Sequence, residues 1–159
     1  DTDALTGLFN RRAFQAAVDE TLLKRIAGVF IFIDVDNFKN YNDKYGHANG
    51  DLCLKHFAAT MKKCFPKDSI LGRYGGDEFV VYIKNAASDD AHRYMDEFQR
   101  EISHLMMSGG EYVTVSASAG GVAFIGEGED FVSLCRSADN MLYDVKRNGK
   151  GTFKMKGAK

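Results

Sequence analysis

The chain has 159 residues, 45% hydrophobic and 27% charged, which is typical of one globular domain, and its net charge of −1 excludes a nucleic-acid partner held through bulk positive charge. No apolar run approaches the roughly 18 residues that span a bilayer, so we expect no membrane contact and no signal peptide. Three widely spaced cysteines form neither a disulfide framework nor a zinc pattern and favour a reducing, cytoplasmic compartment.

The first elements expected are a helix and a fully buried strand. Apolar residues at helical spacing predict an amphipathic helix over residues 11–24, with Asn10 as its cap. Five consecutive apolar residues at 29–33 predict a strand that is buried on both faces. Asp34 follows this strand directly, where a carboxylate is costly unless it is paired or metal-bound. The plainer alternative is that Asp34 caps the next helix.

Two helices are expected next. Residues 37–45 predict a short helix that Gly46 closes, and a second helix is expected to begin at Gly50 and to carry an apolar stripe to residue 64. Lys39 lies roughly a turn and a half beyond Asp34, from where its ammonium can reach a phosphate, although a lone lysine is normally a solvated surface residue.

Asn42 and Asp51 have the chemistry to recognise guanine. One carboxylate can accept both the N1–H and the exocyclic amine of guanine. Adenine has no N1–H, so Asp51 would be left desolvated and unpaired, at a cost of roughly 1–3 kcal/mol. Asn42 can satisfy another polar edge of the base. The alternative is that Asp51 only complements the dipole of the second helix.

A β-hairpin over residues 71–83 carries the strongest signal in the chain. Gly75 and Gly76 are expected to supply the positive φ angles of a tight turn, and Asp77 and Glu78 leave that turn side by side. Two acids at a turn are usually just solvated. A second strand, however, delivers Asp34 and its neighbours to the same rim, and two strands that bring acids together can hold Mg²⁺ against a phosphate.

The C-terminal half completes an α/β sandwich. We expect a helix over residues 89–107, a strand over 113–119 with one polar face, a bulge at residues 120–121, a strand over 122–125, a helix over 131–145 and a strand over 152–155. The order of elements favours a mixed, mainly antiparallel sheet flanked by helices. Lys146 and Lys150 stand four residues apart at the end of the last helix, a position that often only complements the dipole.

The motifs together resemble the GGDEF family, the diguanylate cyclases. Residues 75–79 match the signature Gly-Gly-Asp-Glu-Phe, and residues 3–11, 34–51 and 137–151 are similar to the entry motif, the metal and guanine segment and the closing helix of the family. The resemblance covers nearly the whole chain in the right order. It implies a single GGDEF domain over residues 1–159, a fold like the palm of nucleotidyl cyclases and polymerases, and a sensory or regulatory domain preceding it in a longer signalling protein.

The resemblance also implies a set of site residues. Two Mg²⁺ ions, or Mn²⁺ in their place, are expected on Asp34, Asp77 and the carbonyl of Val35. Asp77 or Glu78 assists deprotonation, a choice that the sequence leaves open, and Lys39 stabilises transition-state charge. The expected substrate contacts are Asn37, Phe38, Asn42, His47, Asp51, Gly75, Gly76, Lys146 and Lys150.

The implied reaction joins two GTP into cyclic di-GMP with release of pyrophosphate, across a homodimer of such domains because one domain offers one guanine pocket. The alternative is a catalytically silent GTP-binding or dimerisation module; an enzyme for adenine or mixed cyclic dinucleotides is disfavoured by Asp51. Many family members carry an Arg-x-x-Asp inhibition motif before the hairpin. In residues 66–69, Pro-Lys-Asp-Ser, neither the Arg nor the Asp of the motif is in place, so no tight product inhibition through that surface is expected.

Overall fold

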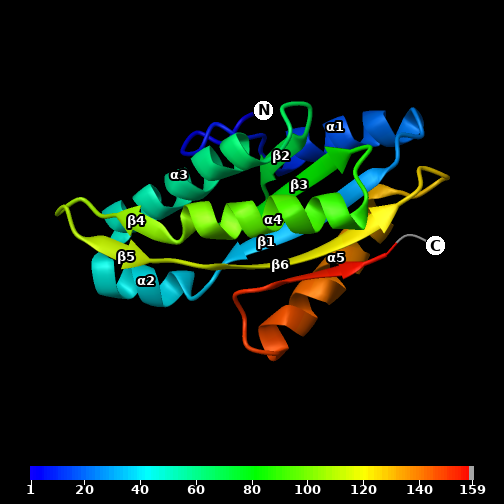
Figure 1. The fold of residues 1–159 in the computed structure, drawn as a ribbon. Coiled ribbons are helices and arrows are strands. Elements are labelled where there is room, and N and C mark those ends of the chain that lie inside the picture. The colour runs from blue at the N-terminus through cyan, green and yellow to red at the C-terminus, as the bar shows by residue number, and fades with distance from the viewer. Residues whose placement is uncertain (158–159) are drawn as a thin grey trace.

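The computed structural model describes residues 1–157 and consists of a five-stranded sheet with helices on both faces (Figure 1). The strand order is β2-β3-β1-β6-β7, and within the described chain each neighbouring pair is antiparallel except β6 with β7. The mixed, mainly antiparallel sheet is therefore confirmed. The elements are α1 (Arg11–Leu23), β1 (Gly28–Val35), α2 (Phe38–Tyr45), α3 (His47–Cys64), β2 (Ile70–Arg73), β3 (Glu78–Lys84), α4 (Ser88–Ile102), β4 (His104–Met106), β5 (Tyr112–Thr114), β6 (Ala117–Phe124), α5 (Phe131–Arg147) and β7 (Phe153–Lys156).

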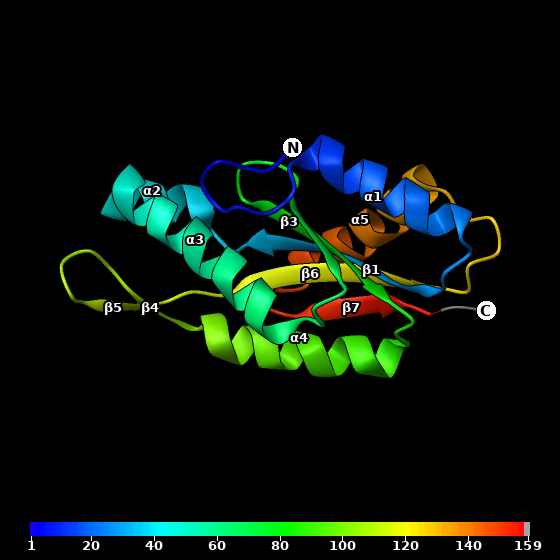
Figure 2. The same cartoon turned by 90° about the horizontal axis from the view of Figure 1, so that it is seen from above.

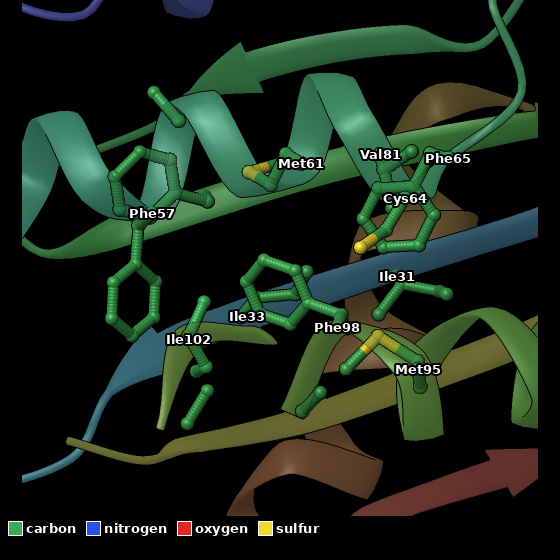
Figure 3. Packing of buried hydrophobic residues seen from close by; sticks show 14 of the residues in the cluster. Ile31, Ile33, Phe57, Met61, Cys64, Phe65, Val81, Met95, Phe98 and Ile102 are labelled. Atoms are coloured by element: carbon green, nitrogen blue, oxygen red, sulfur yellow. The ribbon is translucent and has the colours of Figure 1, made fainter. Parts of the chain in front are cut away.

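Strand β1 lies at the centre of the sheet and is buried along its whole length, as its unbroken apolar run predicts. Successive side chains of a strand point to opposite faces, so β1 contributes to two cores. Ile31 and Ile33 pack with α3 and α4, whose side chains Figure 3 shows from close by. Phe30 and Phe32 pack with α1 and α5 on the other face, and Figure 2 shows these two layers from above.

The antiparallel register decides which side chains meet at the end of β1. Asp34 continues the row of Phe30 and Phe32 that faces α5, and it lies opposite Glu78 of β3 and Ser118 of β6. The apolar run thus ends in a carboxylate that is flanked on both sides and covered by a helix. This position, at the rim of the sheet, is where the site is built.

Two boundaries in the second half differ from the sequence-based expectation. The helix expected over residues 89–107 ends at Ile102, and His104–Met106 forms strand β4, which pairs with β5 as a separate two-stranded ribbon. The single strand expected over residues 113–119 is divided between β5 and β6, which belong to different sheets. Strand pairing between separate segments decides both boundaries, and the periodicity of the local sequence does not reveal such pairing.

The bulge expected at Gly120 and Gly121 is also wrong, because β6 pairs with β1 in unbroken register through both glycines. The need for glycine at position 120 comes from helix α5. A Cβ atom there would lie 2.1 Å from the backbone nitrogen of Leu142 and 2.5 Å from the carbonyl oxygen of Ala138. Gly120 therefore permits the close approach of α5 to the sheet. None of the described helices combines the length and apolar character of a membrane span.

We expect Gly120→Ala to destabilise the domain by about 2 kcal/mol or more, because both atoms in the way belong to the helix backbone and cannot rotate aside. Urea unfolding followed by circular dichroism measures the change. Gly109→Ala is the matched control, since no atom lies within 4 Å of the added methyl group and the backbone there does not need positive φ. Equal stability of the two variants would contradict the close approach of α5.

Candidate active site

Four predicted residues meet at the ends of β1 and β3. Asp34 and Glu78 are cross-strand partners, and the backbone N–H of Val35 donates to the carbonyl oxygen of Asp77 at 3.1 Å. The acid at the end of β1 and the two acids that follow the Gly75–Gly76 turn are therefore neighbours in space. The next acid along the chain, Asp36, has a different role: its carboxylate accepts hydrogen bonds from the hydroxyls of Ser116 (2.6 Å) and Ser118 (2.5 Å), which fixes the end of β1 to β6.

Asp34 is the most constrained carboxylate of the site. Its side chain is only 8% exposed, and its Oδ2 atom accepts a hydrogen bond from the ammonium of Lys146 on α5. Its other oxygen, Oδ1, is buried and has no hydrogen-bond partner among the described residues. Burial raises the pKa of Asp34; the ion pair with Lys146 opposes the shift, and nearby Asp77 and Asp139 add to it. The carboxylate is thus held where a further cation would stabilise it.

The same charges act on Glu78 and Lys146. The pKa of Glu78 is raised by burial first, and then by the negative charges of Asp34 and Asp77. Burial works against the charged form of Lys146, but its hydrogen bond to Asp34 and the surrounding acids outweigh burial, so the pKa of Lys146 is raised. The negative charges of Asp34, Asp77 and Glu78 together therefore exceed the single positive charge of the Lys146 ammonium.

Two cavities open on either side of the ion pair, and Asp34 and Lys146 line both. The first, of about 380 Å³, extends along α5 past Glu78 and Asp139. The second, of about 300 Å³, lies between Asp77, residues 35–40 at the end of β1 and the start of α2, and the two lysines of the C-terminal segment. The second cavity is the one that brings predicted metal ligands and predicted phosphate contacts together.

The wall of the second cavity combines a helix start with cations. Helix α2 begins after Asn37, whose φ of 54° is left-handed, and the first N–H groups of a helix have no partner within it. Lys39 is exposed and lines the cavity. The spacing of Lys146 and Lys150 predicted that both lie on the last helix, but Lys150 does not. It follows the end of α5 with a φ of 64°, and its ammonium donates to Oδ1 of Asn37 at 3.0 Å.

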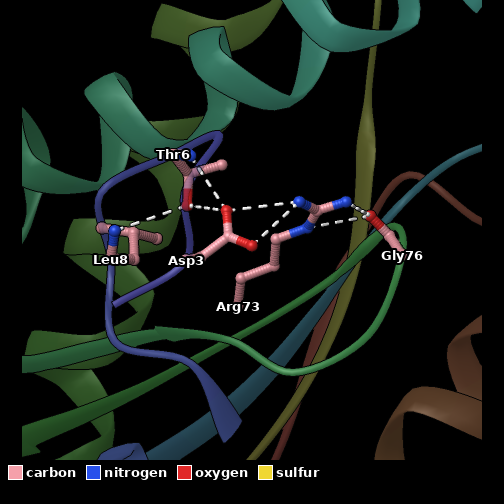
Figure 4. A network of polar contacts seen from close by, with 5 residues as sticks. All are labelled: Asp3, Thr6, Leu8, Arg73 and Gly76. Carbon is pink, nitrogen blue, oxygen red and sulfur yellow. Dashed lines mark hydrogen bonds and ion pairs between the residues drawn. The ribbon is translucent and has the colours of Figure 1, made fainter. Parts of the chain in front are cut away.

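The turn that carries Asp77 is held by Arg73, as Figure 4 shows. The guanidinium donates to the carbonyl oxygen of Gly76 (2.8 and 3.2 Å) and to the carboxylate of Asp3 (3.1 and 3.2 Å), which in turn accepts from the hydroxyl of Thr6 at 2.7 Å. The lead-in segment is thus tied to the residue before Asp77. The sequence alone offers no partner for Arg73.

The positive φ angles expected at Gly75 and Gly76 are not present. Gly75 lies close to the acid cluster, since a Cβ there would lie 2.3 Å from Oε1 of Glu78. Gly76 is open on the outer side, with no atom within 4 Å of an added Cβ. Gly75 therefore leaves room for the Glu78 carboxylate.

The predicted guanine contacts lie on the facing helices α2 and α3, outside the lining of both cavities. Helix α3 begins at His47, three residues earlier than expected, and both His47 and Asp51 are exposed. The Asn42 amide packs directly over Gly50, where a Cβ would come within 1.8 Å of Oδ1 of Asn42. This oxygen is buried and has no partner among the described residues.

Two residues of the site were missed from the sequence. Asp139 on α5 lines the first cavity and raises the pKa of both Asp34 and Glu78 through its charge. Its spacing of seven residues before Lys146, two helical turns on one face, was the available signal. Gly50 was noted only as a helix start, although the glycine directly before Asp51 makes room for the Asn42 amide.

The architecture is that of palm-like domains, a mixed central sheet flanked by helices. The GGDEF domain of TpbB (YfiN) from Pseudomonas aeruginosa superposes with a TM-score of 0.91 at 30% identity, over 98% of this chain and 94% of that one. The GGDEF domain of DgcB from Caulobacter crescentus, solved in complex with c-di-GMP, gives a TM-score of 0.88 at 29% identity, over 97% and 92%.

Residues 1–152 match the family described as diguanylate cyclase, GGDEF domain, and the chain belongs to this family. It is 34% identical over 164 residues to the response regulator PleD of Caulobacter vibrioides, covering 99% of this chain and 36% of PleD. It is 33% identical over 156 residues to the cyclic di-GMP phosphodiesterase PdeR of Escherichia coli, covering 96% and 23%. The chain thus spans well under half the length of these relatives.

The donor set fits a divalent cation. The unpartnered Oδ1 of Asp34 is a buried carboxylate oxygen, and Asp77 and the carbonyl of Val35 are neighbouring oxygen donors. Among residues 1–157 no three His, Cys, Asp or Glu side chains form a complete metal site. A cation here would therefore also need water and substrate oxygens, which is how Mg²⁺ is commonly bound.

The raised pKa of Glu78 makes stability depend on pH in a defined direction. From its ordinary value of 4.5 upward, through the raised folded value, the folded state binds more protons than the unfolded state, so the free energy of unfolding falls as pH rises. The substitution Glu78→Gln removes the ionisable group, and with it this fall in the free energy of unfolding. In metal-free buffer we expect the variant to be more stable than the wild type at pH 7, by less than about 1 kcal/mol because the group is partly solvated.

Thermal unfolding in EDTA at pH 7 and below pH 4 measures this difference, which should shrink in the acid. Glu111→Gln, at an exposed position away from the site, is the control and should change stability little at either pH. A Glu78→Gln variant that is less stable than the wild type at pH 7 would refute the charge crowding.

Proposed function

We propose that this domain is a diguanylate cyclase that condenses two GTP into cyclic di-GMP and releases pyrophosphate. The observation that carries the proposal is the second cavity, where Asp34 of β1 and Asp77 of the turn before β3 face the start of α2 and three lysines. Acids suit metal ions, and cations with free N–H groups suit a triphosphate. Membership of the GGDEF family, whose relatives include the diguanylate cyclase DgcM of Escherichia coli, supports it (33% identity; 93% of this chain, 36% of DgcM).

In the proposed mechanism, Asp34, Asp77 and the Val35 carbonyl hold two Mg²⁺, or Mn²⁺ as the alternative. When bound, these ions lower the pKa of the attacking 3′-hydroxyl and neutralise charge on the phosphoryl oxygens. Glu78, with its raised pKa, is placed to accept a proton, and the choice between Asp77 and Glu78 as the base is left to mutagenesis.

The chain's other residues bind and orient the nucleotide. Lys146 and Lys150 neutralise the triphosphate, while the N–H groups that follow Asn37 and begin at Phe38 donate to its oxygens. Lys39 stabilises charge in the transition state. The base lies at the junction of α2 and α3, with Asn42, Asp51 and His47 as its contacts and with Gly75 and Gly76 leaving room at the turn.

The product requires two guanylates, whereas one domain carries one such site. We therefore place the reaction at the interface of a two-fold homodimer, in which each 3′-hydroxyl attacks the α-phosphorus of the other GTP. A segment preceding this chain in the parent protein would supply the regulated dimerisation.

The competing proposal is a silent regulatory module, and the similarity to a protein named as a phosphodiesterase keeps it open. Both predicted metal acids, Asp34 and Asp77, line the cavity, which favours catalysis because a degenerate site usually lacks one of its charged ligands.

Incubation of the protein with GTP, ATP and Mg²⁺, followed by mass spectrometry, separates the candidates. We expect cyclic di-GMP as the product, and Asp77→Asn should fold normally yet lower turnover by about two orders of magnitude or more, because one charged metal ligand is lost. Asp96→Asn, on the exposed side of α4, is the control and should retain turnover. Absence of any cyclic dinucleotide from the wild type at high protein concentration would favour the silent module.

Catalysis across a dimer makes the rate depend on concentration. Below the dimerisation constant, the initial rate should rise roughly with the square of protein concentration, because only the paired fraction is active. Initial rates over a dilution series, matched to sedimentation of the same samples, measure this. A rate proportional to concentration throughout the monomer–dimer range would exclude the two-domain site.

A further inference from the structure

Lys146 occupies the carboxylate on which the proposed metal site depends. Its ammonium is bonded to Oδ2 of Asp34, and the acids Asp77 and Glu78 also act on its charge. The side chain of Lys146 is 45% exposed, while that of Asp34 is 8% exposed. The ion pair therefore joins a buried acid to a half-exposed cation, which rises from the last turn of α5 and lines both cavities.

An ammonium and a divalent ion compete for such a site. A metal on Asp34 and Asp77 would lie within a few ångströms of the Lys146 ammonium, where two positive charges repel strongly under partial burial. Removing Lys146 without a replacement would leave a buried carboxylate uncompensated, which is the costly state of a broken ion pair. In the nucleotide-free site, the buried charge of Asp34 is thus compensated by a cation of the chain itself.

Lys150 differs from Lys146 in this respect. Both lysines line the second cavity, but the ammonium of Lys150 donates to the amide oxygen of Asn37 and forms no ion pair with a carboxylate of residues 1–157. It contributes positive charge to the cavity without occupying a metal ligand, which makes Lys150 the natural comparison.

We propose that Lys146 is the resident cation of the nucleotide-free site and couples metal binding to nucleotide binding. It holds Asp34 until a metal–triphosphate complex arrives, and its ammonium then moves from the carboxylate to the phosphate oxygens. This inference rests on the proposed function. Because linkage is reciprocal, the metal binds weakly without nucleotide and more tightly with it, and the same holds for the nucleotide with respect to metal.

The test measures Mn²⁺ binding without nucleotide, from the loss of the free-ion signal in electron paramagnetic resonance. Lys146→Met should bind Mn²⁺ about ten-fold or more tightly than the wild type, because the competing charge has left the ligand. Lys150→Met should change the affinity by less than about three-fold, since only a nearby charge is removed. Lys146→Arg, which keeps a cation against Asp34, should remain close to the wild type.

A second measurement uses a GTP analogue with a methylene bridge between the α- and β-phosphorus atoms. It should tighten Mn²⁺ binding in the wild type and do so much less in Lys146→Met. Thermal unfolding checks folding, and the deficit of Lys146→Met in EDTA should be recovered by Mn²⁺. Lys146→Gln, which keeps a donor for Asp34 without the charge, should also bind Mn²⁺ more tightly than the wild type if the methionine variant does not fold.

The outcomes separate this inference from the proposed function. The proposal that Lys146 is the resident cation is refuted if Mn²⁺ affinity is the same in the wild type and in both neutral variants at position 146. It is also refuted if the affinity rises equally in Lys150→Met. Neither result contradicts cyclase activity. If no variant binds Mn²⁺ even with the nucleotide and no cyclic dinucleotide forms, the proposed function fails and the inference fails with it.

Discussion

The constraint on which the site depends is the placing of a carboxylate at the end of a central strand that is buried along its whole length. Strand β1 is apolar because both of its faces are covered, and Asp34 is the first residue of its α5-facing row that is not apolar. A lone charge there would be unstable, so the fold must bring a cation to it. Lys146 on α5 provides that cation in the structure, and the depth at which α5 packs over Gly120 decides whether it can.

The position of Asp77, on the other side of the acid cluster, depends on a different set of contacts. Asp77 belongs to a turn rather than a strand, and turns are the parts of a sheet most prone to move. Here the turn is restrained from two sides, by the Val35 N–H on the carbonyl of Asp77 and by Arg73 on the carbonyl of Gly76. Since Arg73 is also bound to Asp3, the segment that enters the domain bears directly on the position of a site residue.

The sequence predicted those parts of the fold that depend on strong local patterns, such as the apolar run of β1 and the capping of α1 by Asn10. It failed where distant pairing decides. His104–Met106 has no residue that excludes a helix, yet it pairs with β5. The glycines at 75, 120 and 50 were read as turn, bulge and helix start, although each makes room for a group far along the chain or across a turn. The predicted site acids could be found because they flank apolar runs of strand residues, whereas Asp139 lies within an ordinary helical surface.

Helix α2 unites the two ends of the proposed nucleotide site. Its eight residues span roughly 12 Å, with the cavity wall at its start and Asn42 about one turn further on. Gly50 then allows α3 to approach until the Asn42 amide lies over the residue before Asp51. On the proposed function, phosphate position and base choice are therefore set by the same short helix. A displacement of α2 would therefore change the phosphate contacts at its start and the base contact of Asn42 together.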